Sequence, residues 1–277
     1  MESERNWASV HSFLVFFRMR KIPYLISDLD HTLLNEKGKV SELTKKLIRQ
    51  SDWQVLLASA RMPSQMLDLI IDLKLTGPQL ALNGAIIFEY QAGQIRILQR
   101  RSVPSKLARR LFQLVHEQLK LPLQWVTDDK FWSTEWTPQV QMEIDYTGIE
   151  VHYASQLPPA TIDDFLVQIP DPEQFEHVQK QIHEQLPSLT LANSGDGYLV
   201  ITAPGVNKAQ AIQYLLDQGI SRREIVAVGD DLNDLPMLKA AGMPLVVANA
   251  KPALKAIAKA VLPDNENDGI AYFLQQS

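Results

Sequence analysis

Short apolar runs alternate with amphipathic segments at both ends of the chain. The continuous apolar runs at residues 24–26, 55–58 and 225–228 are typical of strands that are buried on both faces of a parallel sheet. Between them, apolar residues recur at helical spacing and predict helices over residues 41–50 and 64–73. Alternating strands and helices indicate an α/β fold with a parallel, Rossmann-like sheet.

The pattern changes in the middle of the chain, where alternation typical of hairpins replaces the regular strand–helix order. Two segments that alternate like a hairpin are followed by an amphipathic helix, short strands and a second helix, predicted over residues 85–90, 95–100, 105–119, 123–127, 132–136, 141–145, 165–169, 173–185 and 197–202. This mixture is α+β in character. We therefore predict that residues 86–202 form a domain inserted between the two parts of the core domain, 22–85 and 203–277, and that residues 1–21 are an N-terminal extension outside the fold.

Composition narrows the classes of function. The 277 residues are 45% hydrophobic and 21% charged, which is typical of a soluble globular protein. A net charge of −5 argues against nonspecific nucleic-acid binding, and no apolar run approaches the roughly 20 residues of a membrane span. The chain has no cysteine, which excludes disulfides, thiolate metal sites and cysteine nucleophiles. We expect a cytoplasmic protein without nucleic-acid or membrane partners.

Polar side chains with chemical potential follow the predicted core strands. Asp28 and Asp30 follow the first strand, Ser59 the second, and Asp230 and Asp234 the strand at 225–228, while Lys208 begins a later helix. The carboxyl ends of parallel strands meet at one edge of a sheet, which is where ligands bind in such folds. Taken singly, the paired aspartates also fit solvated loop residues, and Ser59 fits a helix cap. Together they supply carboxylates for a cation, a hydroxyl and a lysine for phosphoryl oxygens, and a carboxylate nucleophile, which favours phosphoryl transfer.

This ordered set of motifs resembles the haloacid dehalogenase (HAD) superfamily. The matching stretches are Asp28-Leu29-Asp30-His31-Thr32-Leu33, Ser59-Ala60-Arg61, Lys208 and Gly229-Asp230-Asp231-Leu232-Asn233-Asp234. The long insert, the Asn83-Gly84-Ala85 junction and the closing Asp268-Gly269 resemble the Cof-type, subclass IIB sugar-phosphatase branch, which carries a C2 cap. The resemblance covers residues 22–275.

The resemblance implies a role for each matching residue. Asp28 would be the nucleophile that becomes an aspartyl phosphate, and Asp30 the general acid and base. Asp28, the backbone carbonyl of Asp30, Asp230 and Asp234 would hold Mg²⁺. The phosphoryl oxygens would be bound by four groups, namely Ser59, the Ala60 backbone, Lys208 and the Asn233 side chain. Asn83 and Gly84 would contact the substrate. His31 and Ala60 depart from the family pattern, because each stands where glycine is usual.

The activity that the resemblance implies is Mg²⁺-dependent hydrolysis of phosphate monoesters of small metabolites, sugar phosphates by preference. A sugar phosphomutase is the alternative, since it would use the same aspartyl phosphate and a similar cap. A non-enzymatic phosphoreceiver also combines acidic residues, a hydroxyl and a lysine. Receivers are about half this size, however, and their phosphorylated aspartate lies on a middle strand. The expected partner is therefore a small phosphorylated metabolite.

Overall fold

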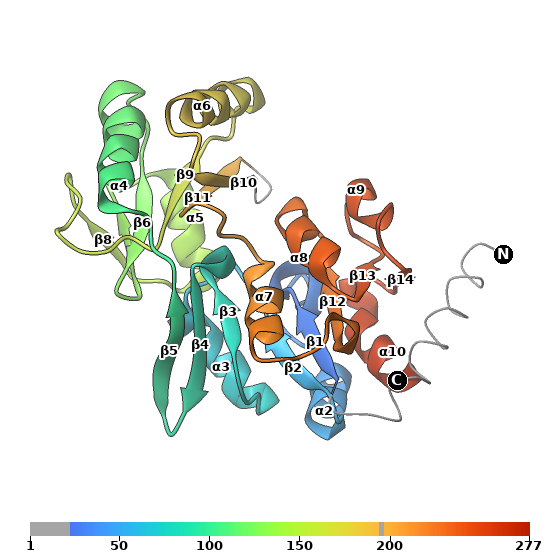
Figure 1. The fold of residues 1–277 in the computed structure, drawn as a ribbon. Coiled ribbons are helices and arrows are strands. Elements are labelled where there is room, and N and C mark those ends of the chain that lie inside the picture. Colours follow the sequence, from blue (N-terminus) through green and yellow to red (C-terminus); the bar gives the residue numbers. More distant parts are fainter. Residues whose placement is uncertain (1–22, 194–196) are drawn as a thin grey trace.

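The computed structural model describes residues 23–193 and 197–277, apart from the side chain of Tyr146 (Figure 1). The predicted N-terminal extension lies outside these residues. The described chain forms two bodies, a core and a cap, joined by the segments around residues 100–103 and 202–206. No helix within the described ranges is long and apolar enough to cross a bilayer.

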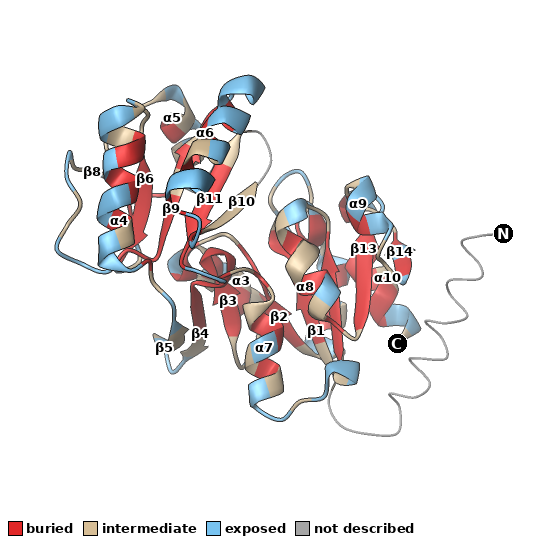
Figure 2. Cartoon of the chain, turned by 45° about the horizontal axis from the view of Figure 1, so that its top comes forward, coloured by how far each residue is buried: buried red, intermediate tan, exposed pale blue. Residues whose placement is uncertain are grey.

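The core is built on a parallel sheet, as the sequence predicts. Its five described strands lie in the order β14 (Ala260–Leu262), β13 (Met243–Val247), β12 (Ile225–Gly229), β1 (Tyr24–Ser27) and β2 (Gln54–Leu57). All four neighbouring pairs are parallel, and Ile26 of β1 aligns with Ala227 and Leu56. Most of their side chains are buried (Figure 2), which explains why these strands read as unbroken apolar runs.

Helices cover this sheet. The helix α2 (Glu42–Gln50) contacts α3 (Pro63–Leu73) and α10 (Gly269–Gln276), whereas α7 (Gln210–Asp217) contacts α8 (Leu235–Ala240), and the short α9 (Pro252–Lys255) precedes β14. Ser41 caps α2 by accepting a hydrogen bond from the Thr44 amide, and Pro63 occupies the first turn of α3. The result is the α/β core that the alternation predicts.

A small antiparallel sheet extends the core beyond β2. It consists of β3 (Gln79–Ala81), β4 (Ile86–Gln91) and β5 (Gln94–Arg100), and Leu80 makes a parallel bridge to Ala58. The apolar residues of β4 pack in the same hydrophobic cluster as the parallel sheet. This hairpin lies within the predicted insert, residues 86–202. In the structure, its apolar residues pack beside the core. The domain boundary at residue 85 stays a prediction.

The cap contains a second sheet with its own hydrophobic cluster. Six described strands lie in the order β10 (Thr190–Asn193), β11 (Tyr198–Thr202), β9 (Asp164–Gln168), β6 (Gln124–Thr127), β7 (Lys130–Ser133) and β8 (Val151–Tyr153). One face of this sheet packs against α4 (Ser105–Phe112) and α6 (Pro172–Gln185), which lie on the side turned away from the core (Figure 1). The other face looks toward the core. The predicted fold class, a Rossmann-like core with an α+β cap, is confirmed.

One predicted strand of the cap is wrong. Residues 141–145 belong to the helix α5 (Pro138–Thr147). Met142 and Ile144 alternate with polar residues and so mimic a strand, but Thr137 caps the helix by accepting a hydrogen bond from Val140, and Pro138 fits its first position. The strands β8 and β10 were not predicted, because both are short and only partly buried.

Candidate active site

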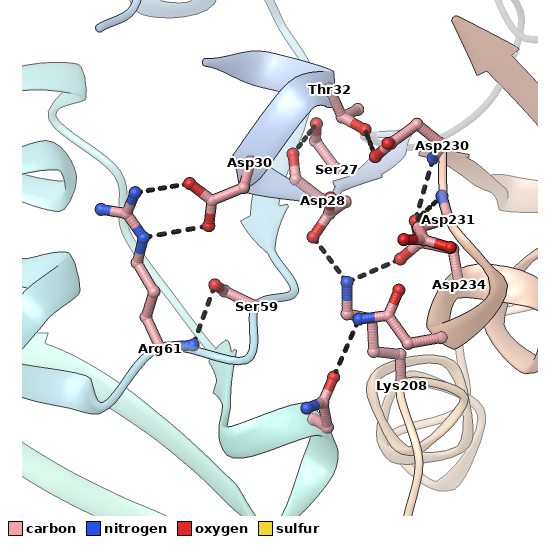
Figure 3. Close-up of polar contacts among 12 residues, drawn as sticks. Ser27, Asp28, Asp30, Thr32, Ser59, Arg61, Lys208, Asp230, Asp231 and Asp234 are labelled. Carbon is pink, nitrogen blue, oxygen red and sulfur yellow. Dashed lines mark hydrogen bonds and ion pairs between the residues drawn. The ribbon is translucent and has the colours of Figure 1, made fainter. Parts of the chain in front are cut away.

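The carboxyl edge of the parallel sheet brings the predicted acidic residues together (Figure 3). Asp28 directly follows β1, and its amide donates to the Val228 carbonyl on β12 at 3.0 Å, which fixes its position. Asp230 directly follows β12, and Lys208 lies just before α7. Segments far apart in the sequence thus meet where β1 and β12 end.

Lys208 lies buried between two carboxylates. Its Nζ donates to Asp28 Oδ1 at 2.5 Å and to Asp234 Oδ1 at 2.7 Å, and its exposed fraction is only 1%. Burial lowers the pKa of Lys208, but the charges of Asp234 and Asp28 outweigh this effect and keep the ammonium charged. Burial, together with the charge of Asp234, raises the pKa of Asp28 well above its usual range, while Lys208 opposes that rise.

Asp234 is held by the backbone as well as by Lys208. Its Oδ2 accepts the amides of Asp230 at 2.9 Å and Asp231 at 3.1 Å. Gly229 makes room for this arrangement, because a Cβ there would lie 2.5 Å from the carboxyl carbon of Asp234. The glycine at the end of β12 is therefore needed to seat the carboxylate beneath Lys208.

Three of the four predicted metal ligands can share one cation. Carboxylate oxygens of Asp28, Asp230 and Asp234 all lie within 4.8 Å of one another. Thr32 orients Asp230 by donating from Oγ1 to Oδ1 at 2.7 Å, and burial raises the pKa of Asp230. Lys208 offsets only one of the three negative charges. An all-oxygen donor set with excess negative charge fits a hard divalent cation such as Mg²⁺.

The carboxylate of Asp30 points away from Lys208 and toward Arg61 (Figure 3). It forms a two-point ion pair with Arg61, with Arg61 Nη2 at 2.5 Å from Oδ1 and Nε at 3.1 Å from Oδ2. Between Asp30 and its neighbour Thr32, His31 has a left-handed φ of 57°, a conformation that favours glycine. The glycine usual in the resembling family would meet no strain at this position.

The predicted phosphate-binding residues lie around the cluster formed by Asp28, Lys208, Asp230 and Asp234. Ser59 is buried, and its Oγ accepts the Arg61 amide at 3.1 Å, so the hydroxyl lies at the start of the turn before α3. Ala60 lines the cavity described below. Asn233 Nδ2 donates to Asn83 Oδ1 at 3.2 Å, and both residues line the cavity.

The two residues predicted to contact substrate differ in setting. Asn83 lines the cavity, and its buried Nδ2 has no hydrogen-bond partner within the described parts of the chain. Gly84 is buried with a φ of 108°, and a Cβ there would lie 2.3 Å from the carbonyl oxygen of Asn207. Gly84 thus allows the β3–β4 connection to pack against the segment that carries Lys208.

A cavity of about 320 Å³ lies between the core and the cap, and its volume suits a small ligand. From the core it is lined by Asp28, Asp30, Ala60, Asn83, Lys208, Asp230 and Asn233, among others. Arg61 and two acidic residues of the cap, Glu143 and Asp164, also line it. These three were not predicted as site residues. Arg61 stands in a matching motif and could have been found, whereas no local pattern marks the cap residues.

Sequence comparison assigns the chain to a family. The haloacid dehalogenase-like hydrolase family matches residues 25–274, and the chain belongs to this family. The predicted Cof-type HAD membership is confirmed, and the enzyme class is that of the HAD phosphatases.

Individual relatives agree with this class. The chain is 23% identical over 257 residues to the 5-amino-6-(5-phospho-D-ribitylamino)uracil phosphatase YcsE of Bacillus subtilis, covering 90% of this chain and 93% of that protein. It is 26% identical over 262 residues to the pyridoxal phosphate phosphatase YbhA of Escherichia coli, covering 89% and 95%. The structure of the HAD subclass IIB sugar phosphatase BT4131 superposes with a TM-score of 0.79 at 20% identity, covering 91% of this chain and 98% of the other. This last similarity supports the fold.

Proposed function

We propose that this phosphatase hydrolyses monoesters of small phosphorylated metabolites, sugar phosphates among them, through an aspartyl phosphate formed on Asp28 with the help of Mg²⁺. The observation that carries the proposal is the meeting of Asp28, Lys208, Asp230 and Asp234, the first three of which line the cavity. A carboxylate beside a buried cation and a hard-cation site is suited to attack phosphorus.

In the proposed first step, a carboxylate oxygen of Asp28 attacks phosphorus while the bond to the leaving oxygen breaks. Lys208 and Ser59 bind the phosphoryl oxygens, and Lys208 also favours the ionised form of Asp28. Asp28, Asp230 and Asp234, with the Asp30 carbonyl, would hold Mg²⁺, which offsets negative charge on the phosphoryl group when bound.

Asp30 has the second role. It gives a proton to the leaving oxygen and then accepts one from the water that attacks the aspartyl phosphate, which frees Asp28. In this structure both carboxylate oxygens of Asp30 accept hydrogen bonds from Arg61, and the carboxylate is directed away from Lys208 (Figure 3). Asp30 must therefore leave Arg61 before it acts as the acid, so the ion pair seen here is the resting arrangement in this proposal.

The substitution Asp28→Asn tests the nucleophile. The amide still accepts a hydrogen bond from Lys208, so the fold should persist, but it cannot attack phosphorus usefully. Phosphate release should fall to background, and no phosphoenzyme should form. Asp52→Asn, on an exposed loop of the core, is the matched control and should keep full activity. Turnover by a contamination-free Asp28→Asn preparation would contradict the assignment.

Metal exchange tests the cation. Activity should disappear with EDTA and return with Mg²⁺, which should also raise the melting temperature because it binds only the folded site. Ca²⁺ should inhibit, because it takes more ligands at longer distances and would misplace Asp28. The assay panel should include sugar phosphates, pyridoxal phosphate and the ribitylaminouracil phosphate named for the relatives. Full activity in metal-free buffer would refute the metal requirement.

A further inference from the structure

One buried carboxylate of the cap takes no part in the proposed chemistry. Asp164 opens β9 and lines the cavity, and its exposed fraction is 6%. Its neighbour Asp163 is also buried but is well paired, since Arg100 donates to both carboxylate oxygens at 2.8 and 2.7 Å and Ser102 adds a third hydrogen bond. By contrast, no residue that the structure describes donates a hydrogen bond to the carboxylate of Asp164.

The strand register directs Asp164 into the cavity. Successive side chains of a strand face opposite sides, and Phe165 belongs to the hydrophobic cluster beneath α4 and α6. Asp164 therefore shares the cavity face with Leu166, and both line the cavity. Directly across from it stand Val126 on β6 and Thr202 on β11, whose hydroxyl already donates to the Val206 carbonyl. The protein itself thus offers Asp164 mainly apolar surroundings.

A buried carboxyl without a partner is costly unless a ligand supplies one. Burial, reinforced by the charge of Asp163, raises the pKa of Asp164 to about 8. Near neutral pH the group is then mostly protonated, with one O–H donor and one carbonyl acceptor. A hydroxyl of a bound ligand matches both.

The charges of the residues that line the cavity limit which charged groups a ligand can have in addition to its phosphate. The cap-derived lining within the described chain contains two ionisable acids, Glu143 and Asp164, and no basic side chain. The basic lining residues Lys208, Arg61 and His31 belong to the core, where they pair with Asp28, Asp30 and Glu36, respectively. A second anionic group reaching the cap would therefore be buried beside Asp164 and Glu143, with no basic side chain of the described cap lining to pair it.

We propose that Asp164 determines specificity by hydrogen-bonding a hydroxyl of an uncharged polyol or sugar leaving group, and that the cap lining, whose described residues include no basic side chain, excludes substrates whose far end is anionic. This inference rests on the proposed phosphatase function, because it concerns the part of the substrate that remains after the phosphate is removed.

A matched set of substrates tests it. Sorbitol 6-phosphate, 6-phosphogluconate and 1-amino-1-deoxysorbitol 6-phosphate differ only at carbon 1, which is a neutral alcohol, a carboxylate or an ammonium. The wild-type kcat/KM with Mg²⁺ should be at least about 100-fold higher for the alcohol than for the carboxylate, as expected when an anion is buried without a cation to pair it. Equal use of these two, or a preference of more than tenfold for the ammonium over the alcohol, would overturn the proposal.

Substitutions of Asp164 then test whether this residue recognises the hydroxyl of the leaving group. Asp164→Leu should lower kcat/KM for sorbitol 6-phosphate about tenfold, the effect of one lost hydrogen bond between neutral groups, and leave p-nitrophenyl phosphate unchanged. Asp164→Asn keeps a donor and an acceptor and should retain most of the sorbitol 6-phosphate activity. Gln168→Leu is the matched control, because Gln168 shares the cavity face of β9 but lies outside the cavity. An equal loss with both substrates in Asp164→Leu would refute a role in specificity.

Failure of the proposed phosphatase function and failure of the inference about the cap would give different results. If the wild-type enzyme releases no phosphate even from p-nitrophenyl phosphate, the phosphatase function falls and this inference falls with it. If p-nitrophenyl phosphate is hydrolysed but the carbon 1 group makes no difference, only the inference about the cap is wrong. The wild-type comparison decides this even if Asp164→Leu fails to fold.

Discussion

Replacing Lys208 by methionine tests how far stability depends on one buried cation. The ammonium is the partner that Asp28 and Asp234 share, at 2.5 and 2.7 Å. Methionine keeps much of the apolar stem but leaves two carboxylates adjacent in a buried site. Burial limits the hydration of both carboxylates, so without the ammonium they repel each other or bind a proton.

The expected loss is large. Removing one partner from a buried ion pair typically costs about 3–5 kcal/mol. For a chain of this size, that corresponds to a fall in melting temperature of roughly 10 °C. The loss should depend on pH, because burial and Asp234 already raise the pKa of Asp28 and Lys208 opposes that rise. A carboxyl whose folded-state pKa is raised costs stability as pH increases through that pKa, so Lys208→Met should be most destabilised above neutral pH and least at pH 5.

Calorimetric or denaturant unfolding in EDTA at pH 5 and pH 8 provides the measurement. Lys180→Met, on the exposed surface of α6 with a 3.9 Å pair to Glu184, is the control and should leave the melting temperature unchanged. Adding Asp28→Asn to Lys208→Met removes one unpaired charge and should restore part of the loss. If Lys208→Met and the wild type have the same melting temperature at pH 8 without metal, the buried cluster is not as isolated from water as its geometry indicates.

Three further substitutions probe other parts of the molecule. With p-nitrophenyl phosphate, Asp30→Asn should give a burst of nitrophenolate and a phosphoenzyme trappable by acid quench, while sugar phosphates slow by about 10²–10⁴-fold; absence of the phosphoenzyme would count against the acid–base role. The folded-state pKa of Asp164 is raised to about 8, so the free energy of unfolding should fall by at most roughly 6 kcal/mol as pH rises from about 4 through 8. Unfolding experiments across that range should show a weaker pH dependence for Asp164→Asn. Gly84→Ala should lower the melting temperature by more than Gly93→Ala. Both glycines have a positive φ, which costs an alanine about 1–2 kcal/mol, but only at Gly84 would the added Cβ also clash with the Asn207 carbonyl. Equal losses of stability in the two variants would show that this clash does not matter.

The sequence predicts the core well because its signals are local. Strands such as β12 are buried on both faces and read as unbroken apolar runs, and each ends at a polar motif. Parallel order then places Asp28 and Asp230 at one edge without knowledge of any contact. The prediction that these residues share a site needed only the fold class and the position of each strand end.

The cap is less predictable because its signals are ambiguous or distant. The segment at 138–147 alternates like a strand, and only the Thr137–Pro138 start reveals a helix. Whether Asp164 faces the cavity depends on the register of β9 between β6 and β11, which no local pattern specifies. The pairing of Asp30 with Arg61 is likewise a choice between conformations that the motif alone does not decide.

The strand order has a consequence for how this chain acquires its structure on the ribosome. β1 lies between β2 and β12, and β12 follows the whole cap in the sequence. Until β12 is made, β1 and β2 are the only described strands of the parallel sheet that are present, so one edge of β1 is open and prone to wrong pairing. The cap has its own hydrophobic cluster and is complete once β11 emerges, so we expect it to fold first. The strand that leads to Asp28 is thus synthesised before the cap and before β12, and it is among the last of the described strands to find both of its neighbours.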